Sequence, residues 1–422
     1  MKKNDILNCL KSCKDIDGYE LSITSKDSRE LFYVLKHLEI NRAVKTTTTT
    51  IKVYAISKKE GTGSSLITVT AADDKASLTK KIKKAIAKAK NNRNNYYPLA
   101  KKTNKASVSK ESKKDLNVIC NNIAKAVFKA DKYKDGWINS TEIFVSKYTN
   151  EFISSTGIKQ KSNSFKINIE IIPTWSNKKE EYELYKFIES GKVDYPSITK
   201  EVDEILTLAK DRSIAKKIDD VNLPNDLLVL VKNDMRDLLV NNLANNMSYY
   251  SKYTKVNHYE IKDVISKNKF DLTMKPDIAG CVNSRRYDDN GVTLKARKII
   301  SKGIACDNYG DIRYGHYLGA KKISGDIPLC ELSSKGFDYK KSKHLIIETF
   351  SSPQLDENIG YWGGEVRLAR YFDGKKYIPL TGFSISGNIY DDLKNIKFSS
   401  EKVTSSSYKG PKYFIFDNIN IF

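Results

Sequence analysis

The chain has 422 residues, of which 40% are hydrophobic and 29% charged, enough for two or three domains with cores of their own. No run approaches the roughly 18 consecutive apolar residues of a membrane span, and the apolar stretch at the N-terminus is too short for a secretory signal. The composition therefore indicates an ordinary globular protein, which we expect in the cytoplasm.

The formal net charge of +22 raises the question of a nucleic-acid partner, because clustered basic residues release counterions from phosphates. Most of the basic residues are lysines, and they accompany abundant Asn, Tyr and Ile, as expected from an AT-rich genome. In the densest basic stretch, residues 78–90, an apolar helical stripe faces away from the lysines. The pattern favours a solvated helix face, and no aromatic stacking positions or glycine clamp indicate an RNA reader.

The cysteine pattern is typical of a reducing compartment. The six cysteines are scattered, and none forms a CxxC pair: Cys9, Cys13, Cys120, Cys281, Cys306 and Cys330. Cys9 and Cys13 share one face of a possible helix, but no histidine lies near them in sequence to complete a zinc set. We therefore predict thiols that bind no metal.

The N-terminal region reads as a short helix followed by a strand meander. Four segments alternate or are β-branched, and they predict strands over residues 18–24, 30–40, 46–57 and 64–70. A helix beginning at Ser77 closes this unit. Residues 91–113 are polar and nearly free of aliphatic side chains, so they predict a surface linker or long loop.

The next region alternates between helices and strands. Apolar residues at spacings of three and four predict a helix over 116–130. Residues 141–175 predict a hairpin-like strand pair with a turn at 155–157 and one buried face. Pro196 is expected to open a further helix.

Residues 229–243, "VLVKNDMRDLLVNNL", predict a buried strand that runs directly into a helix. Strand-to-helix junctions are common places for catalytic groups, yet this entry carries only Asn233, Asp234, Arg236 and Asp237. We expect Asp234 and Asp237 to stabilise the helix N-terminus through its dipole.

Beyond residue 250 the chain shows short strands punctuated by glycines, which predict hairpins and bulges in a mainly antiparallel β region. The expected fold class is therefore α+β. We predict an N-terminal mixed domain over residues 1–220, with a strand meander and amphipathic helices, and a β-rich domain over residues 221–422.

Three segments carry a resemblance to a known family. They are "NSRRYDDNGVTLKARKIISKGI", "GYWGGEVRLARYFDGKKYIPLTGFSISGN" and, upstream, "EFISSTGIKQKSNSFKINIEI". Each resembles a segment of the TldD/PmbA family, also called modulators of DNA gyrase, and the strongest motifs all lie after residue 270. On these segments the chain is identified as a member of this family by resemblance.

The resemblance implies a cytosolic zinc peptidase system that acts on unfolded or extended peptides and is built from two related subunits. In the zinc-bearing subunit, TldD, a strand leads into a helix carrying HExxxH, and a cysteine near the C-terminus completes the site. The other subunit, PmbA or TldE, bears no metal.

Carried over by position, the implied His, Glu and His fall on Asn233, Asp234 and Leu238, and the last cysteine is Cys330. The resemblance therefore implies a chain closer to the metal-free subunit, without catalytic residues or a cofactor of its own. Such a chain would shape a peptide cleft or support a catalytic partner, as a homodimer or as a heterodimer with a zinc-bearing relative, which would supply any zinc.

Two alternatives stay open at this point. His258, His316 and His344 could build a different zinc site with Cys281, Cys306 or Asp288, although none sits at a recognised metal spacing. The chain could also bind nucleic acid or a DNA-associated enzyme such as gyrase, as its charge and the family name suggest.

Polar and glycine residues of the C-terminal half are candidates for the wall of a peptide cleft, because glycine permits close approach of an added strand. The candidates are Asn283, Arg285, Asp288, Asp289, Gly291, Arg297, Gly363, Gly364, Glu365 and Arg367. The other interpretation is turn chemistry with Asp and Arg pairs, which also suits Asp311 and Arg313. Aromatic residues of the same half could line a groove or interface, or be ordinary strand formers: Tyr287, Tyr309, Tyr314, Tyr317, Tyr361, Trp362 and Tyr371.

Overall fold

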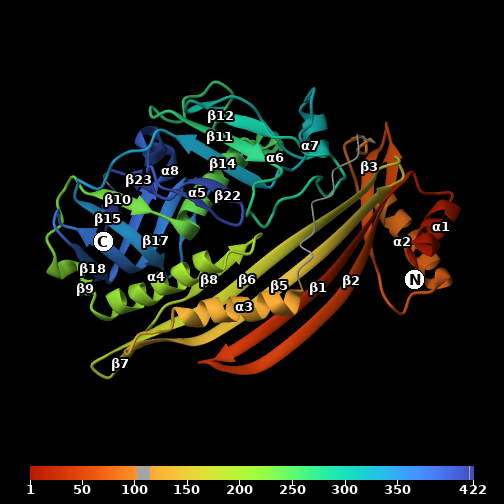
Figure 1. Ribbon diagram of the computed structural model, residues 1–422. Coiled ribbons are helices and arrows are strands. Elements are labelled where there is room, and N and C mark those ends of the chain that lie inside the picture. Colours follow the sequence, from red (N-terminus) through yellow and green to blue (C-terminus); the bar gives the residue numbers. More distant parts are fainter. Residues whose placement is uncertain (102–114, 418) are drawn as a thin grey trace.

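The protein is seen here in a computed structural model that describes residues 1–101, 115–417 and 419–422. Within these ranges three β-sheets are surrounded by helices (Figure 1). The first sheet uses the N-terminal half of the chain, and the other two use the C-terminal half. Residues 102–114 of the predicted linker lie outside the described residues.

The first sheet consists of long antiparallel strands in the order β4-β3-β2-β1-β5-β6-β7, with β8 paired to β6. Its strands are β1 (Gly18–Val34), β2 (His37–Ser57), β3 (Gly61–Val69), β4 (Arg93–Asn94), β5 (Gly136–Ser154), β6 (Lys159–Asn177), β7 (Glu180–Glu183) and β8 (Lys186–Ser190). The meander and the β5–β6 hairpin are confirmed. The predicted strand over 30–40 is wrong, because the chain reverses at Leu35 and Lys36, a turn without the usual glycine or asparagine.

Two pairs of helices pack on this sheet. They are α1 (Lys3–Ser12) with α2 (Lys75–Asn91), and α3 (Leu116–Lys129) with α4 (Tyr195–Ser213). The predicted helices are confirmed. The Asp74 side chain accepts from the Ser77 backbone N–H at the start of α2, and Pro196 lies in the first turn of α4. Ile119, Ile123 and Val127 of α3 are fully buried against the sheet.

The first part of the predicted linker is packed and not a free surface segment. β4 pairs with β3, and Tyr97 is buried. The Thr62 hydroxyl donates to the Tyr97 carbonyl at 2.9 Å. The polar composition of this segment suggested a free linker, but the pairing of β4 with β3 and the buried Tyr97 ring hold it against the first sheet.

The second and third sheets are mixed but mainly antiparallel, which confirms the α+β class. The second has the order β20-β23-β10-β15-β17-β18-β9, with β16, β19 and β24 at its side, and the third has the order β13-β12-β11-β14-β22-β21. Second-sheet strands are β9 (Lys216–Lys217), β10 (Leu228–Val231), β15 (His344–Phe350), β16 (Gln354–Leu355), β17 (Tyr361–Phe372), β18 (Tyr377–Thr381), β19 (Phe383–Asn388), β20 (Lys397–Phe398), β23 (Phe414–Phe416) and β24 (Asn420–Ile421). Third-sheet strands are β11 (Phe270–Lys275), β12 (Arg297–Ser301), β13 (Ile304–Ala305), β14 (Leu329–Ser334), β21 (Lys402–Thr404) and β22 (Tyr408–Pro411).

The predicted strand-to-helix junction lies at the centre of the C-terminal half. β10 runs between β15 and β23, and α5 (Asn233–Asn246) follows it. Met235, Leu239 and Leu243 of α5 belong to one core that includes residues of both C-terminal sheets. The C-terminal half also has three short helices, α6 (Tyr249–Thr254), α7 (Ile312–Tyr317) and α8 (Ile389–Asp392). Among the described residues, no helix has both the length and the apolar character needed to cross a membrane. The domain division at residue 220 stays a prediction.

Packing of α3 on the first sheet gives a direct stability test. Ile123 is fully buried, and Ile123→Ala should lower the free energy of unfolding by about 2–5 kcal/mol, through lost burial and the cavity left behind. Val118→Ala on the same helix is the matched control, because Val118 is 54% exposed and its truncation should cost less than about 0.5 kcal/mol. Denaturant unfolding of both variants measures the difference, and equal costs would contradict the packing.

Candidate functional site

The junction between β10 and α5 is a sharp turn of the backbone. Lys232 is extended, and Asn233, the first residue of α5, adopts the left-handed conformation, with φ of 50°. Asparagine tolerates this conformation better than most residues. The turn leaves the side chains of Asn233 and Asp234 exposed, while Met235 and Arg236 turn inward.

A buried carboxylate anchors the strand side of the junction. Glu348 of β15 lies in an ion pair with Lys232 and in a second one with Arg370 of β17, whose Nε donates to Glu348 Oε1 at 2.7 Å. Burial alone would raise the pKa of Glu348, but the two cations hold it below its ordinary value. The carboxylate is therefore ionised at neutral pH and fastens β10, β15 and β17 together.

A second charged pair closes the helix side of the junction. Arg236 is 2% exposed, its Nε donates to Asp237 Oδ1 at 2.8 Å, and its guanidinium lies 4.8 Å from the ring centre of Tyr408. The Ser405 hydroxyl donates to the other oxygen of Asp237 at 3.2 Å. Burial raises the pKa of Asp237 despite these partners. Asp237 is thus the partner of Arg236, and the predicted dipole role suits only Asp234, which lies in the first turn.

The residues at the implied metal positions do not fit a zinc ion. Leu238 is half-buried and has no donor atom, and Asn233 offers only an amide in place of an imidazole. The Cys330 thiol lies in the third sheet, 3.7 Å from the Met274 sulfur, and burial raises its pKa to about 12. Across residues 1–101, 115–417 and 419–422, no three His, Cys, Asp or Glu side chains gather where they could hold a metal ion.

The histidines of the alternative zinc site have separate aromatic surroundings. His258 stacks on Tyr390 with ring centres 3.7 Å apart, and His316 meets the edge of Tyr96. His344 is buried, with its ring nitrogens 2.8 Å from the Ser342 carbonyl and 3.1 Å from the Tyr377 hydroxyl. The structure does not bring these rings together with Cys281, Cys306 or Asp288 as a metal-binding group.

The candidate segment around Gly291 is organised by turn chemistry. Asp288 is buried and accepts from the backbone N–H groups of Asn290, Val292 and Asp326, at 3.0, 2.9 and 3.1 Å. Burial raises its pKa. The Arg285 guanidinium lies 3.2 Å from Asp289 and 3.1 Å from Asp326.

The same segment docks on the first sheet. The Gly291 carbonyl accepts from Gln160 Nε2 at 3.1 Å, and a Cβ at Gly291 would lie 2.3 Å from the Phe152 ring. The Tyr287 hydroxyl donates to the Asn150 carbonyl at 3.2 Å. The structure therefore places Asp288 and Gly291 at a contact between the two halves of the chain.

A buried carboxylate of the first sheet lies close enough to this contact for the charges of Asp288 and Asp289 to influence its pKa. Glu20 is 4% exposed and accepts from the Tyr54 hydroxyl at 2.8 Å. Burial raises the pKa of Glu20 to about 7, and the negative charges of Asp288 and Asp289 add to the rise, which Lys52 opposes.

The other candidates lie elsewhere. Asn283 donates to the Ser407 hydroxyl at 2.6 Å. Arg297 donates to Tyr249, Asn308 and Lys322, and lines a depression of about 410 Å³. The remaining four, Gly363, Gly364, Glu365 and Arg367, belong to β17. Gly363 pairs with Gln354 of β16 on one side and with Ser386 of β19 on the other, so its backbone is already held by two strands.

The predicted aromatic residues divide between core and surface. Tyr309, Trp362 and Tyr371 are buried in the C-terminal core. Tyr314 and Tyr317 of α7 pack with Tyr250 and Tyr253 of α6, and this aromatic group joins the two helices. The Arg313 guanidinium lies 5.0 Å from the Tyr314 ring centre and 5.7 Å from that of Tyr317. The Asp311 side chain accepts from the Tyr314 backbone and begins α7.

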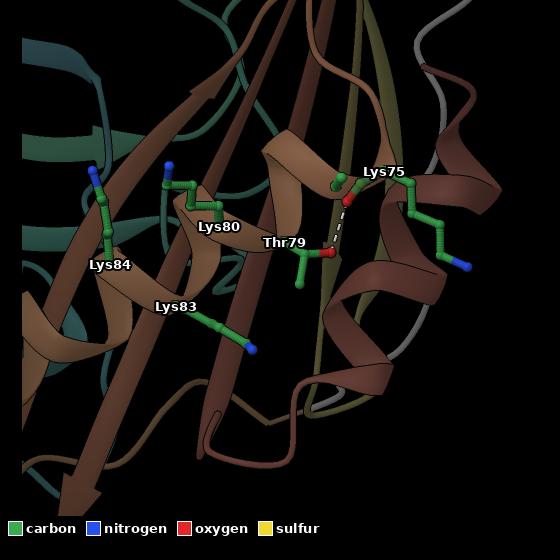
Figure 2. A pocket seen from close by; sticks show the side chains of 6 residues that line it. Lys75, Thr79, Lys80, Lys83 and Lys84 are labelled. Carbon is green, nitrogen blue, oxygen red and sulfur yellow. Dashed lines mark hydrogen bonds between the residues drawn. The ribbon is translucent and has the colours of Figure 1, made fainter.

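A shallow depression of about 680 Å³ lies on the lysine face of α2 (Figure 2). It is lined by Lys75, Ala76, Thr79, Lys80, Lys83 and Lys84. The lysine side chains reach outward in different directions, and the one hydrogen bond drawn between the lining residues runs from the Thr79 hydroxyl to the Lys75 carbonyl at 2.7 Å. The arrangement is that of a solvated helix face, so the β10–α5 junction remains the candidate site.

Sequence reasoning missed three charged residues that fix this junction: Lys232, Glu348 and Arg370. One signal was available, because Glu348 interrupts the apolar run "HLIIETF" of β15. An ionisable residue inside a buried strand usually has a charged partner.

Comparisons with known proteins found a family match for the C-terminal half and solved structures with a similar fold. Residues 228–421 match the family model of the "PmbA/TldA metallopeptidase C-terminal domain". No curated protein matches the chain in sequence.

Three solved structures are similar along nearly the whole chain, each with a TM-score of 0.78. TldE from Thermococcus kodakarensis is 13% identical, and 99% of each chain is covered. A protein described as a modulator of DNA gyrase from Thermotoga maritima is 12% identical, with 100% of this chain and 99% of that chain covered. A protein of the same description from Bacteroides thetaiotaomicron is 14% identical, with 99% and 97% covered. These likenesses show the fold.

Removal of the Glu348 charge should destabilise the junction strongly. Glu348→Gln leaves two cations without their shared partner and should lower the free energy of unfolding by about 3–5 kcal/mol. Because the pKa of Glu348 is lowered, its contribution is present above the ordinary value of 4.5 and is lost as pH falls below it. Unfolding of Glu348→Gln and of the exposed control Glu365→Gln, measured at neutral pH, checks this. Equal stability of the two variants would contradict it.

The raised pKa of Glu20 predicts the opposite dependence of folding stability on pH. Its pKa rises from 4.5 in the unfolded chain to about 7 in the folded one, so the folded state binds more protons between these values. Stability should therefore fall as pH rises from 4.5 to 7, by up to about 3 kcal/mol from this group. Glu20→Gln should flatten that part of the stability profile, whereas the exposed control Glu181→Gln should keep the wild-type slope.

Proposed function

Because residues 228–421 carry the C-terminal domain of the PmbA/TldD family, we propose that the chain is a metal-free, non-catalytic member of a metallopeptidase-related system. In this proposal it works in the cytoplasm beside a zinc-bearing relative with the HExxxH helix. It would hold unfolded or extended peptides for that partner, in a heterodimer of the two chains.

The observation that carries the proposal is the chemistry of the β10–α5 junction. The turn and the helix are present, but positions 233, 234 and 238 hold Asn, Asp and Leu, a set that cannot replace two imidazoles and a glutamate. The nearby charges are already paired within the protein, Arg236 with Asp237 and Lys232 with Glu348. The junction therefore has the geometry of a catalytic mount without imidazole or thiolate ligands for a metal ion, and the Asp234 carboxylate is the charged group that it leaves facing solvent.

The C-terminal candidates for peptide contact remain predictions. Near the contact with the first sheet, Arg285 is partly exposed and Asp289 is almost fully exposed, and Glu365 and Arg367 are exposed on β17. These side chains could present charge to an extended peptide, whereas the paired backbone at Gly363 favours side-chain contacts over strand addition.

The proposal predicts binding without cleavage. The purified chain should bind a fluorescently labelled unfolded peptide in an anisotropy titration and leave it intact after long incubation with added zinc. Arg285→Ala should weaken binding several-fold if that side chain contacts the peptide, and Lys58→Ala, on an exposed turn of the first sheet, is the control.

Cleavage by the chain alone that a chelator abolishes would contradict the proposal. Failure to bind any unfolded peptide would contradict the peptide-holding part. Co-purification from the cytoplasm of its own cell with an HExxxH-bearing relative would support the assignment of the partner, and recovery of nucleic acid in its place would contradict it.

A further inference from the structure

The exposed face of α2 carries positive charge only. The helix contains no acidic residue from Lys75 to Asn91, and six of its lysines are exposed: Lys75, Lys80, Lys83, Lys84, Lys88 and Lys90. In the part of the chain that the structure describes, none of these six lies in an ion pair, whereas the half-buried Lys81 pairs with Asp73 at 2.7 Å. The face is therefore solvated in the free protein, and its charge is available to a partner.

The composition of the chain does not account for this face. A bias towards AT-rich codons favours lysine over arginine but does not remove acidic residues, since α4, a helix of similar length on the same sheet, carries four: Glu201, Asp203, Glu204 and Asp211. In α2 the like charges of Lys80, Lys84 and Lys88 follow one another at intervals of four residues, a spacing that destabilises a helix. An anion bound along this row would relieve the repulsion.

The lysine face is hollowed and long. The depression of about 680 Å³ lies along it, with lysines extending outward from the helix (Figure 2). From Lys75 to Lys90 the face is about 22 Å long, and lysines four residues apart are separated by about 6 Å along the axis. A nucleic-acid duplex presents about one negative charge for every 1.7 Å of its axis. A row of cations beside a hollow is therefore complementary to the ridge of phosphates on a duplex.

Other anionic partners fit this face less well. The large apolar side chains of α2 are buried against the first sheet, and the apolar residues on its exposed side are Ala76 and Ala87. Surface helices bind membranes through buried apolar area as well as charge, and α2 cannot supply that area. The helix also has no arginine or aromatic side chain with which to read or stack bases. The attraction that remains is to regularly spaced phosphates, which a duplex offers whatever its sequence.

We propose that the lysine face of α2 binds the phosphate backbone of double-stranded nucleic acid, without regard to sequence. The ammonium groups act as point charges, and release of counterions from the duplex supplies the affinity. The face lies on the N-terminal half of the chain, so a duplex would bind in addition to the proposed partner of the β10–α5 junction and not in its place. The inference goes beyond the proposed function and does not rest on it.

The chain offers a matched pair of variants for the test. Lys80→Gln with Lys84→Gln removes two exposed charges from α2, and Lys125→Gln with Lys129→Gln removes two exposed charges at the same spacing from α3. Anisotropy titration of a labelled duplex of about 20 base pairs, in about 50 to 200 mM salt, measures the binding of each. For the wild type, the logarithm of the binding constant should fall with the logarithm of salt concentration with a slope of about −4 to −5. The α2 variant should bind about tenfold more weakly, with a slope less steep by about 2, and the α3 variant should match the wild type.

Glutamine and lysine have similar helix propensities, so thermal unfolding should show both variants folded like the wild type. The proposal is overturned if the wild type does not bind the duplex at about 100 mM salt, or if the α2 variant binds as the wild type does. Equal losses in the two variants would also overturn it, because they would assign the binding to overall charge. So would binding to vesicles of anionic phospholipid with none to the duplex. Binding of an unfolded peptide should be the same for the α2 variant and the wild type, which separates this inference from the proposed function.

Discussion

The buried carboxylate of Glu348 is the interaction on which the candidate site depends. It joins Lys232 at the end of β10 to Arg370 of β17, and so fixes the point where the chain leaves the second sheet and enters α5. A buried ion pair of this kind adds little net stability by itself, but loss of one member leaves an uncompensated charge. The geometry of the junction is thus maintained by charges that face each other and not by groups that face a substrate.

The junction has the strand, turn and helix of the implied metal site but not its ligands. The helix begins at a left-handed Asn233, and its first turn presents Asp234 to solvent, while Arg236 and Asp237 neutralise each other beneath it. Zinc catalysis needs imidazole or thiolate ligands and a group that activates water. Position 238 is a leucine and position 233 an asparagine, so the junction lacks the ligands that this chemistry requires.

Much of the fold follows from the sequence, because period-3.6 and period-2 patterns report directly on buried faces. The stripe of α3 and the alternation of Ile167, Ile169 and Ile171 are examples. The turn at Leu35 was missed because no glycine or asparagine indicates it. Charged partners distant in sequence were also missed. Glu348 pairs with Lys232, which follows β10, and with Arg370 of β17, and no local sequence pattern indicates either pair.

Turn chemistry explains several candidate residues better than ligand chemistry does. The Asp288 carboxylate accepts hydrogen bonds from three backbone N–H groups. Position 291 needs a glycine because a Cβ there would collide with the Phe152 ring. Both residues help to seat the C-terminal half on the first sheet.

Metal stoichiometry tests the central claim most directly. Native mass spectrometry of the purified chain, loaded with excess zinc and then desalted, should show the mass of the polypeptide without bound metal. A single zinc ion retained per chain, and lost on substitution of Asp234, would show that the junction is a working metal site and would contradict the account.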